Sequence, residues 1–146
     1  MSYGVLLYSS YDITEEELAE VILQADGILT PDSPGYFGGL VDGEAHVYVF
    51  RIPCYDGVFD WEGKPLDEGV IVLLDQAKAL LGGEFQTWIY IRLGYRPGCQ
   101  RLAVRFAHAC CQRWPCVVDN YKGQLFSSKE INQLFEEDGV FSGYSA

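Results

Sequence analysis

Basic side chains are scarce in this sequence. Its 146 residues include 10 lysines and arginines but 21 aspartates and glutamates, so the formal net charge at pH 7 is −11. A field of this sign repels nucleic acid and anionic membrane surfaces and attracts basic partners, so we expect neither a nucleic acid nor a membrane as a partner. Acidity also keeps many proteins soluble without any role in recognition, and the charge alone leaves that interpretation open.

Long hydrophobic runs and a secretion signal are also missing. The apolar run GVIVLL at 69–74 is far shorter than the ~20 residues that a membrane-spanning helix needs. The first residues, MSYGVLLYSSYDITEEE, lack the basic segment and the small-residue cleavage site of a signal peptide. We therefore expect a cytoplasmic protein. The length and the 49% of hydrophobic residues indicate a single globular domain over residues 1–146.

The apolar periodicity predicts alternating strands and helices. Strands are expected at 2–10, 45–53 and 85–95, with a short one near 37–41, and two more joined by a turn within 116–126. Helices are expected at 13–27, 66–83, 96–115 and 127–139. Capping boxes mark two of the helix starts, Thr14 with Glu17 and Ser127 with Glu130. This order predicts an α+β (loosely α/β) fold: a single mixed sheet with about four helices packed on it.

The stretch HACCQRWPC at 108–116 raises the question of metal or redox chemistry. On the predicted helix, an apolar stripe faces the core, while His108 falls on the opposite face; the stripe consists of Cys99, Leu102, Ala103, Phe106, Ala109 and Cys110. The remaining cysteines are Cys54, Cys111 and Cys116, and the spacing offers neither the paired ligands of structural zinc nor a C-x-x-C motif. We interpret the stretch as core packing, with metal or redox chemistry as the less favoured alternative.

Catalytic and cofactor-binding motifs are absent from the sequence. It contains two histidines, His46 and His108, and no G-x-S-x-G, G-x-G-x-x-G or G-x₄-G-K-[ST] motif. The acidic clusters at 15–17 and 136–138 lie at predicted helix ends, where solvated carboxylates are common. We therefore expect no catalytic residue, no cofactor and no metal, and we do not expect an enzyme.

One segment combines acidic and aromatic residues in the way that recognition surfaces do. Residues 1–84 carry 16 acids against 3 bases, and within them the segment CYDGVFDWEGKPLDE at 54–68 has weak periodicity. Aromatic anchors supply contact area, while carboxylates pair with basic groups on a partner. The alternative is that the aromatics cover the sheet and the acids are only solvated. The expected partner-binding residues are Tyr55, Asp56, Phe59, Asp60, Trp61, Glu62, Asp67 and Glu68.

A family resemblance is carried by RLAVRFAHACCQRWPCVVDNYKGQLFSSKEINQLF at 101–135. This run of helix, Arg-Trp-Pro, short strand ending in Asp, glycine turn and Ser-x-x-Glu helix start resembles the C-terminal pattern of small bacterial immunity proteins. These belong to polymorphic toxin systems of the contact-dependent growth inhibition and Rhs type. The resemblance implies a cytosolic, non-catalytic inhibitor of a cognate toxin C-terminal domain, often a nuclease. It covers about a quarter of the chain and carries over no binding residue.

Two functional hypotheses therefore stand. The first is an immunity protein whose acidic, aromatic surface covers a basic toxin domain. The second is a small cytosolic enzyme or ligand-binding domain that uses cysteine and histidine in a pocket between the sheet and the helix over 97–113. A position of the gene directly beside a large secreted toxin gene would favour the first hypothesis.

Overall fold

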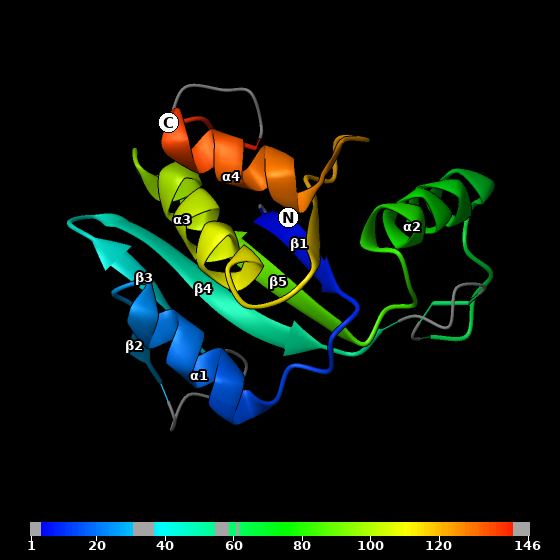
Figure 1. Cartoon of the computed structure of the whole chain (residues 1–146), viewed down its shortest axis with the longest axis horizontal. Coiled ribbons are helices and arrows are strands. Elements are labelled where there is room, and N and C mark those ends of the chain that lie inside the picture. The colour runs from blue at the N-terminus through cyan, green and yellow to red at the C-terminus, as the bar shows by residue number, and fades with distance from the viewer. Residues whose placement is uncertain (1–3, 31–36, 55–58, 61, 142–146) are drawn as a thin grey trace.

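The computed structural model describes residues 4–30, 37–54, 59–60 and 62–141 of the chain. Four helices and seven strands form one α+β domain within these residues (Figure 1). The strands are β1 Gly4–Ser9, β2 Ile28–Leu29, β3 Gly38–Asp42, β4 Ala45–Ile52, β5 Thr87–Leu93, β6 Cys116–Asp119 and β7 Leu125–Phe126. The helices are α1 Glu15–Gln24, α2 Glu68–Leu81, α3 Cys99–Cys111 and α4 Ser128–Glu136.

The predicted α+β class with a single sheet and four helices is confirmed. The strand order is β2-β3-β4-β5-β1-β6-β7, so strands that are distant in sequence become neighbours. All pairings between these strands are antiparallel, whereas the sequence analysis expected a mixed sheet. Strand β1 lies between β5 and β6, where Leu7 pairs with Ile89 on one side and with Val118 on the other. Its continuous apolar sequence fits this position, since both of its faces are buried.

One face of the sheet carries three helices. Figure 1 shows α3 between α1 and α4, running across the central strands. Val47 and Val49 of β4 and Ile89 and Ile91 of β5 point into this side and are fully buried. Phe106 on α3 belongs to the same core, which is the main hydrophobic core of the domain.

The opposite face of the sheet is covered only in part, by α2. Leu74 and Ala77 of α2 form a second, smaller core with Tyr8 and Trp88 of the sheet. Figure 1 shows α2 at one end of the molecule, apart from the other three helices. Towards β4 this face carries half-buried aromatic rings, among them Tyr48, over which the guanidinium of Arg92 lies 5.3 Å from the ring centre. The two faces of the sheet therefore differ in how completely they are closed.

Both predicted capping boxes are confirmed. The Thr14 hydroxyl accepts a hydrogen bond from the amide of Glu17 at 3.1 Å, and the Glu17 carboxylate accepts one from the amide of Thr14 at 3.1 Å. Ser127 and Glu130 make the equivalent pair at 3.2 and 3.1 Å. Asp67 directly precedes α2, but its side chain makes no capping hydrogen bond.

Two local features differ from the sequence prediction. Residues 28–29 form the short strand β2, where no strand was expected, and a Cβ atom at Gly38 would lie 2.6 Å from the Ile28 carbonyl oxygen, so the close pairing depends on glycine. Helix α3 ends at Cys111, earlier than the expected residue 115, because Pro115 disfavours helical backbone at the residue before it. In the part of the chain that the structure describes, no helix is long and apolar enough to cross a membrane.

Candidate functional site

The inward stripe of α3 is buried as predicted. All of its members lie in the main core except Ala109, which is half-buried, and Val104 and Ala107 are buried as well. The buried surface is wider than one stripe because α3 packs against helices on both sides and against the sheet beneath (Figure 1). The opposite stripe of α3 is not simply solvent-exposed: Arg101 and Gln112 are exposed, but Arg105 and His108 are half-buried.

The cysteines are placed mainly as core residues. All five are free thiols, and Cys99, Cys110 and Cys116 are buried. Burial raises the pKa of the Cys110 thiol well above its usual value, so this thiol stays protonated. Among the residues that the structure describes, no three histidine, cysteine or acidic side chains gather in a way that could hold a metal ion. The placement agrees with the core-packing interpretation of the 108–116 stretch.

One cysteine contact was missed at the sequence level. The thiol of Cys116, at the start of β6, hydrogen-bonds Cys111, at the end of α3, and this bond lowers the pKa of Cys111 and raises that of Cys116. The C-x₄-C spacing spans a helix end and a strand start, which is the signal that could have suggested that the chain turns back here.

The two histidines lie in different environments. The His108 ring stacks on Phe135 of α4, with ring centres 3.9 Å apart, and its Nδ1 lies 2.8 Å from the Asn132 Oδ1. His46 lies on the partly covered face of the sheet, where its ring centre is 4.9 Å from that of Tyr48. Neither histidine is among the described residues that line the two cavities described below.

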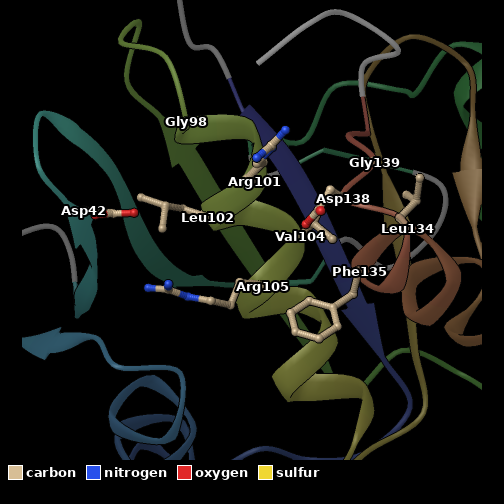
Figure 2. A pocket seen from close by; sticks show the side chains of 10 residues that line it. All are labelled: Asp42, Gly98, Arg101, Leu102, Val104, Arg105, Leu134, Phe135, Asp138 and Gly139. Carbon is tan, nitrogen blue, oxygen red and sulfur yellow. The ribbon is translucent and has the colours of Figure 1, made fainter.

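A cavity of about 340 Å³ lies where α3, the end of α4 and the end of β3 meet (Figure 2). Two arginines line it, Arg101 and Arg105, together with Asp42 and Asp138. Neither arginine forms an ion pair with another described residue, and the Nε atom of Arg105 is buried without a hydrogen-bond partner among them. Such groups could hold an anion only if they converged on it.

The side chains in Figure 2 do not converge. Arg105 extends toward the side of the cavity where Asp42 lies, whereas Arg101 extends in a different direction. The two aspartates place negative charge on the same walls, which reduces the attraction for an anion. The cavity therefore presents opposite charges around an open space rather than a two-arginine clamp.

The predicted partner-binding residues are only partly described by the structure. Tyr55, Asp56 and Trp61 lie outside the described residues. Phe59 is 44% exposed, and Glu62, Asp67 and Glu68 are exposed. Asp60 has an internal role, because its Oδ1 accepts hydrogen bonds from the amides of Glu62 and Lys64, each at 2.9 Å, and thereby fixes the turn.

Helix α2 extends this segment with an exposed apolar surface. Val70, Val72 and Leu80 are 37%, 53% and 51% exposed. The partner surface predicted from the sequence ends at Glu68 and does not include these residues of α2. The available signal was the run Val-Ile-Val-Leu-Leu at 70–74, because five consecutive apolar residues on a helix cannot all face one side.

A second cavity, of about 300 Å³, lies between α2 and the sheet. One of its walls is Asp119, the last residue of β6, which is only 3% exposed. The Tyr8 hydroxyl donates to its Oδ2 at 2.9 Å, and the Tyr121 amide donates to its Oδ1 at 2.8 Å. Removal from water raises the pKa of this carboxyl despite both bonds. The sequence showed only an acid at the end of an apolar strand.

No protein-family model, curated protein or solved structure matches the chain. The resemblance of residues 101–135 to immunity proteins therefore stays a prediction, and the functional argument depends on the surfaces and cavities of the molecule itself.

Proposed function

We propose that the chain is a non-catalytic immunity protein that binds and neutralises a basic, nuclease-type toxin domain in the cytoplasm. The observation that carries this proposal is the outward face of α2. This face combines exposed aliphatic side chains with carboxylates that no neighbouring base neutralises. It also continues the acidic, aromatic segment at 54–68 that the sequence analysis selected.

The apolar part of the surface supports contact with another protein. Leu74 and Ala77 are the residues that attach α2 to the sheet, so the fold does not need apolar side chains on the outer side of the helix. Val72 and Leu80 nevertheless lie half exposed there. Apolar side chains that gather on one surface and are rimmed by charge mark protein-binding sites more often than isolated exposed residues do.

The charged part of the surface supports a basic partner. The two lysines near α2 are already paired: Lys64 lies 3.5 Å from Glu62, and Lys78 lies 3.0 Å from Glu84. Three acids, Asp67, Glu68 and Asp75, form no ion pair within the described part of the chain. Glu68, Val72 and Asp75 follow each other at helical spacing, so carboxylates flank the exposed valine. Such a surface complements lysines and arginines around an apolar contact.

Co-expression with the toxin domain encoded beside this gene tests the proposal. We expect growth to be rescued and the two proteins to co-purify. The variant Glu68→Lys with Asp75→Lys should slow association and weaken protection, since both charges of the α2 face are reversed. The matched control is Glu16→Lys with Glu136→Lys, which also reverses two exposed acids, one of them in a first helical turn, on the other helices.

Different results would refute the proposed immunity function and the proposed α2 binding surface. A toxin domain that neither binds the chain nor is neutralised by it refutes the immunity function. Full binding and protection by the α2 variant at low salt, or an equal loss in the control variant, refutes the α2 surface.

A further inference from the structure

The cavity between α2 and the sheet has the composition of a ligand site. It measures about 300 Å³, which is within the usual size range of small-molecule sites. Its walls come from four parts of the fold: α2, the central strands β1 and β5, the end of β6 and the loop after it. The cavity lies on the inner side of α2 and is therefore separate from the proposed partner surface on the outer side.

A single carboxylate provides the charge of this cavity. No lysine, arginine or histidine is among its described lining residues, and Asp119 forms no ion pair with a described residue. The Tyr8 hydroxyl and the Tyr121 amide, which hydrogen-bond this carboxylate, are neutral donors, and each uses one of the two oxygens. A carboxylate oxygen accepts more than one hydrogen bond, so both oxygens retain acceptor capacity toward the cavity. The negative charge is therefore solvated by neutral donors and is not balanced by a cation.

The other walls are apolar and aromatic. Val70, Leu73 and Leu74 come from α2, and Tyr8 and Trp88 come from the sheet. The rings of Tyr8 and Trp88 meet edge to face, with their centres 5.2 Å apart. Aromatic faces attract cations, and aliphatic walls favour an apolar group over water. The walls thus suit a ligand that has a positive end and an apolar body.

We propose that this cavity binds a small organic ammonium ion, with the ammonium group on Asp119 and the apolar body between α2 and the sheet. The charge of the buried carboxylate selects against anions, and the lack of a balancing base favours a cation over a neutral molecule. Burial favours the neutral form of the Asp119 carboxyl and raises its pKa, so a bound cation stabilises the ionised form instead. The binding should therefore weaken when Asp119 is protonated.

A titration of the full chain with three probes of similar shape tests the charge selectivity. The probes are 2-phenylethylammonium, neutral 2-phenylethanol and anionic 3-phenylpropionate, followed through the backbone amide signals of the protein by NMR. We expect saturable binding of the ammonium probe with a Kd of roughly 1 mM, as is usual for so small a ligand. The signals of Tyr8, Asp119 and Gly123 should shift, and the neutral and anionic probes should bind at least about 10-fold more weakly.

Two pairs of variants locate the site. Asp119→Asn should lower the affinity for the ammonium probe at least about 10-fold, whereas Asp75→Asn removes an exposed charge from the outer face of α2 and should have no effect. Val70→Trp should fill the opening of the cavity and abolish binding, whereas Val72→Trp places the same side chain on the outer face of α2 and should not. If Asp119→Asn does not fold, the comparison of Val70→Trp with Val72→Trp still tests whether the probe binds in this cavity.

Three results would overturn the proposal. Equal binding of the neutral probe would mean that the cavity selects apolar groups only. If the controls Asp75→Asn and Val72→Trp lost as much affinity for the ammonium probe as Asp119→Asn and Val70→Trp, the probe would bind outside this cavity. The absence of saturable binding by the folded chain up to about 10 mM of the ammonium probe would show that the cavity is no such site.

Discussion

The hydrogen bond between Tyr8 and Asp119 allows a quantitative test of the buried carboxylate. Tyr8 is 2% exposed, and its hydroxyl donates to the Asp119 Oδ2 at 2.9 Å. Tyr8→Phe removes the donor and keeps the ring, so it creates almost no cavity in the smaller core. Because the acceptor is charged and buried, the variant should lose about 1.5–3 kcal/mol of unfolding free energy at neutral pH. Urea unfolding followed by circular dichroism measures this loss.

The loss should depend on pH in a direction that the structure fixes. Burial raises the pKa of Asp119 in the folded state above its unfolded value of about 3.9, and the Tyr8 bond opposes that rise. The folded state therefore favours the protonated acid, and this contribution is present at low pH and is lost as the pH rises through the folded pKa. Without the Tyr8 bond the folded pKa is higher still. The stability difference between the two proteins should therefore be smallest at acidic pH and grow as the pH rises above about 4.

The matched control is Tyr11→Phe. Its hydroxyl also donates to a carboxylate, the Glu17 Oε2, at 2.9 Å, but this pair is exposed to solvent. Water replaces the lost donor there, so the loss should be clearly smaller than for Tyr8→Phe. Equal losses in the two variants, or a Tyr8→Phe effect that does not change with pH, would refute the account of Asp119 as a buried, desolvated acid.

The remaining predictions concern the α3 helix and the cysteines, and unfolding free energies check each of them. Phe106→Ala should cost about 3–5 kcal/mol because the ring is fully buried in the main core, whereas Arg101→Gln at the exposed side of the same helix should stay within about 0.5 kcal/mol; equal effects would mean that the helix faces are assigned the wrong way round. Cys110→Ser should cost about 1–3 kcal/mol because it places a hydroxyl in an apolar, fully buried position. The purified chain should contain no stoichiometric zinc or iron, and one equivalent of metal per chain would contradict the core interpretation of the cysteines.

Local sequence signals predicted most of the secondary structure. The capping boxes at Thr14 and Ser127 and the apolar stripe of α3 depend on residues within one or a few helical turns, so a short window contains all the information. Strand β2 has no such signal. It pairs with β3, where Gly38 allows a close approach to Ile28, and that pairing is visible only when the sheet is assembled.

The candidate sites were harder to predict because they depend on long-range pairing or on competing local bonds. Tyr8 and Asp119 are 111 positions apart and meet because β1 pairs with β6 in a register that sets Leu6 opposite Asp119. The apolar periodicity of the sequence does not indicate which residues of β1 and β6 lie opposite each other. Asp60 shows the opposite difficulty: composition favoured it as a recognition residue, but its carboxylate holds the turn before α2. A carboxylate in a turn-rich segment can serve the backbone as well as a partner.

The apolar run at 70–74 contributes both to the proposed partner surface on the outer side of α2 and to the proposed ligand cavity on its inner side. A helix that packs on a sheet buries only part of its circumference. In a run of five apolar residues, some side chains must therefore point away from the sheet. In α2, Leu74 packs on the sheet, Val70 and Leu73 line the cavity, and Val72 faces solvent. Solubility alone would favour a polar residue at the last of these positions. Under the proposed function, a partner with basic groups around an apolar contact would cover Val72 between Glu68 and Asp75.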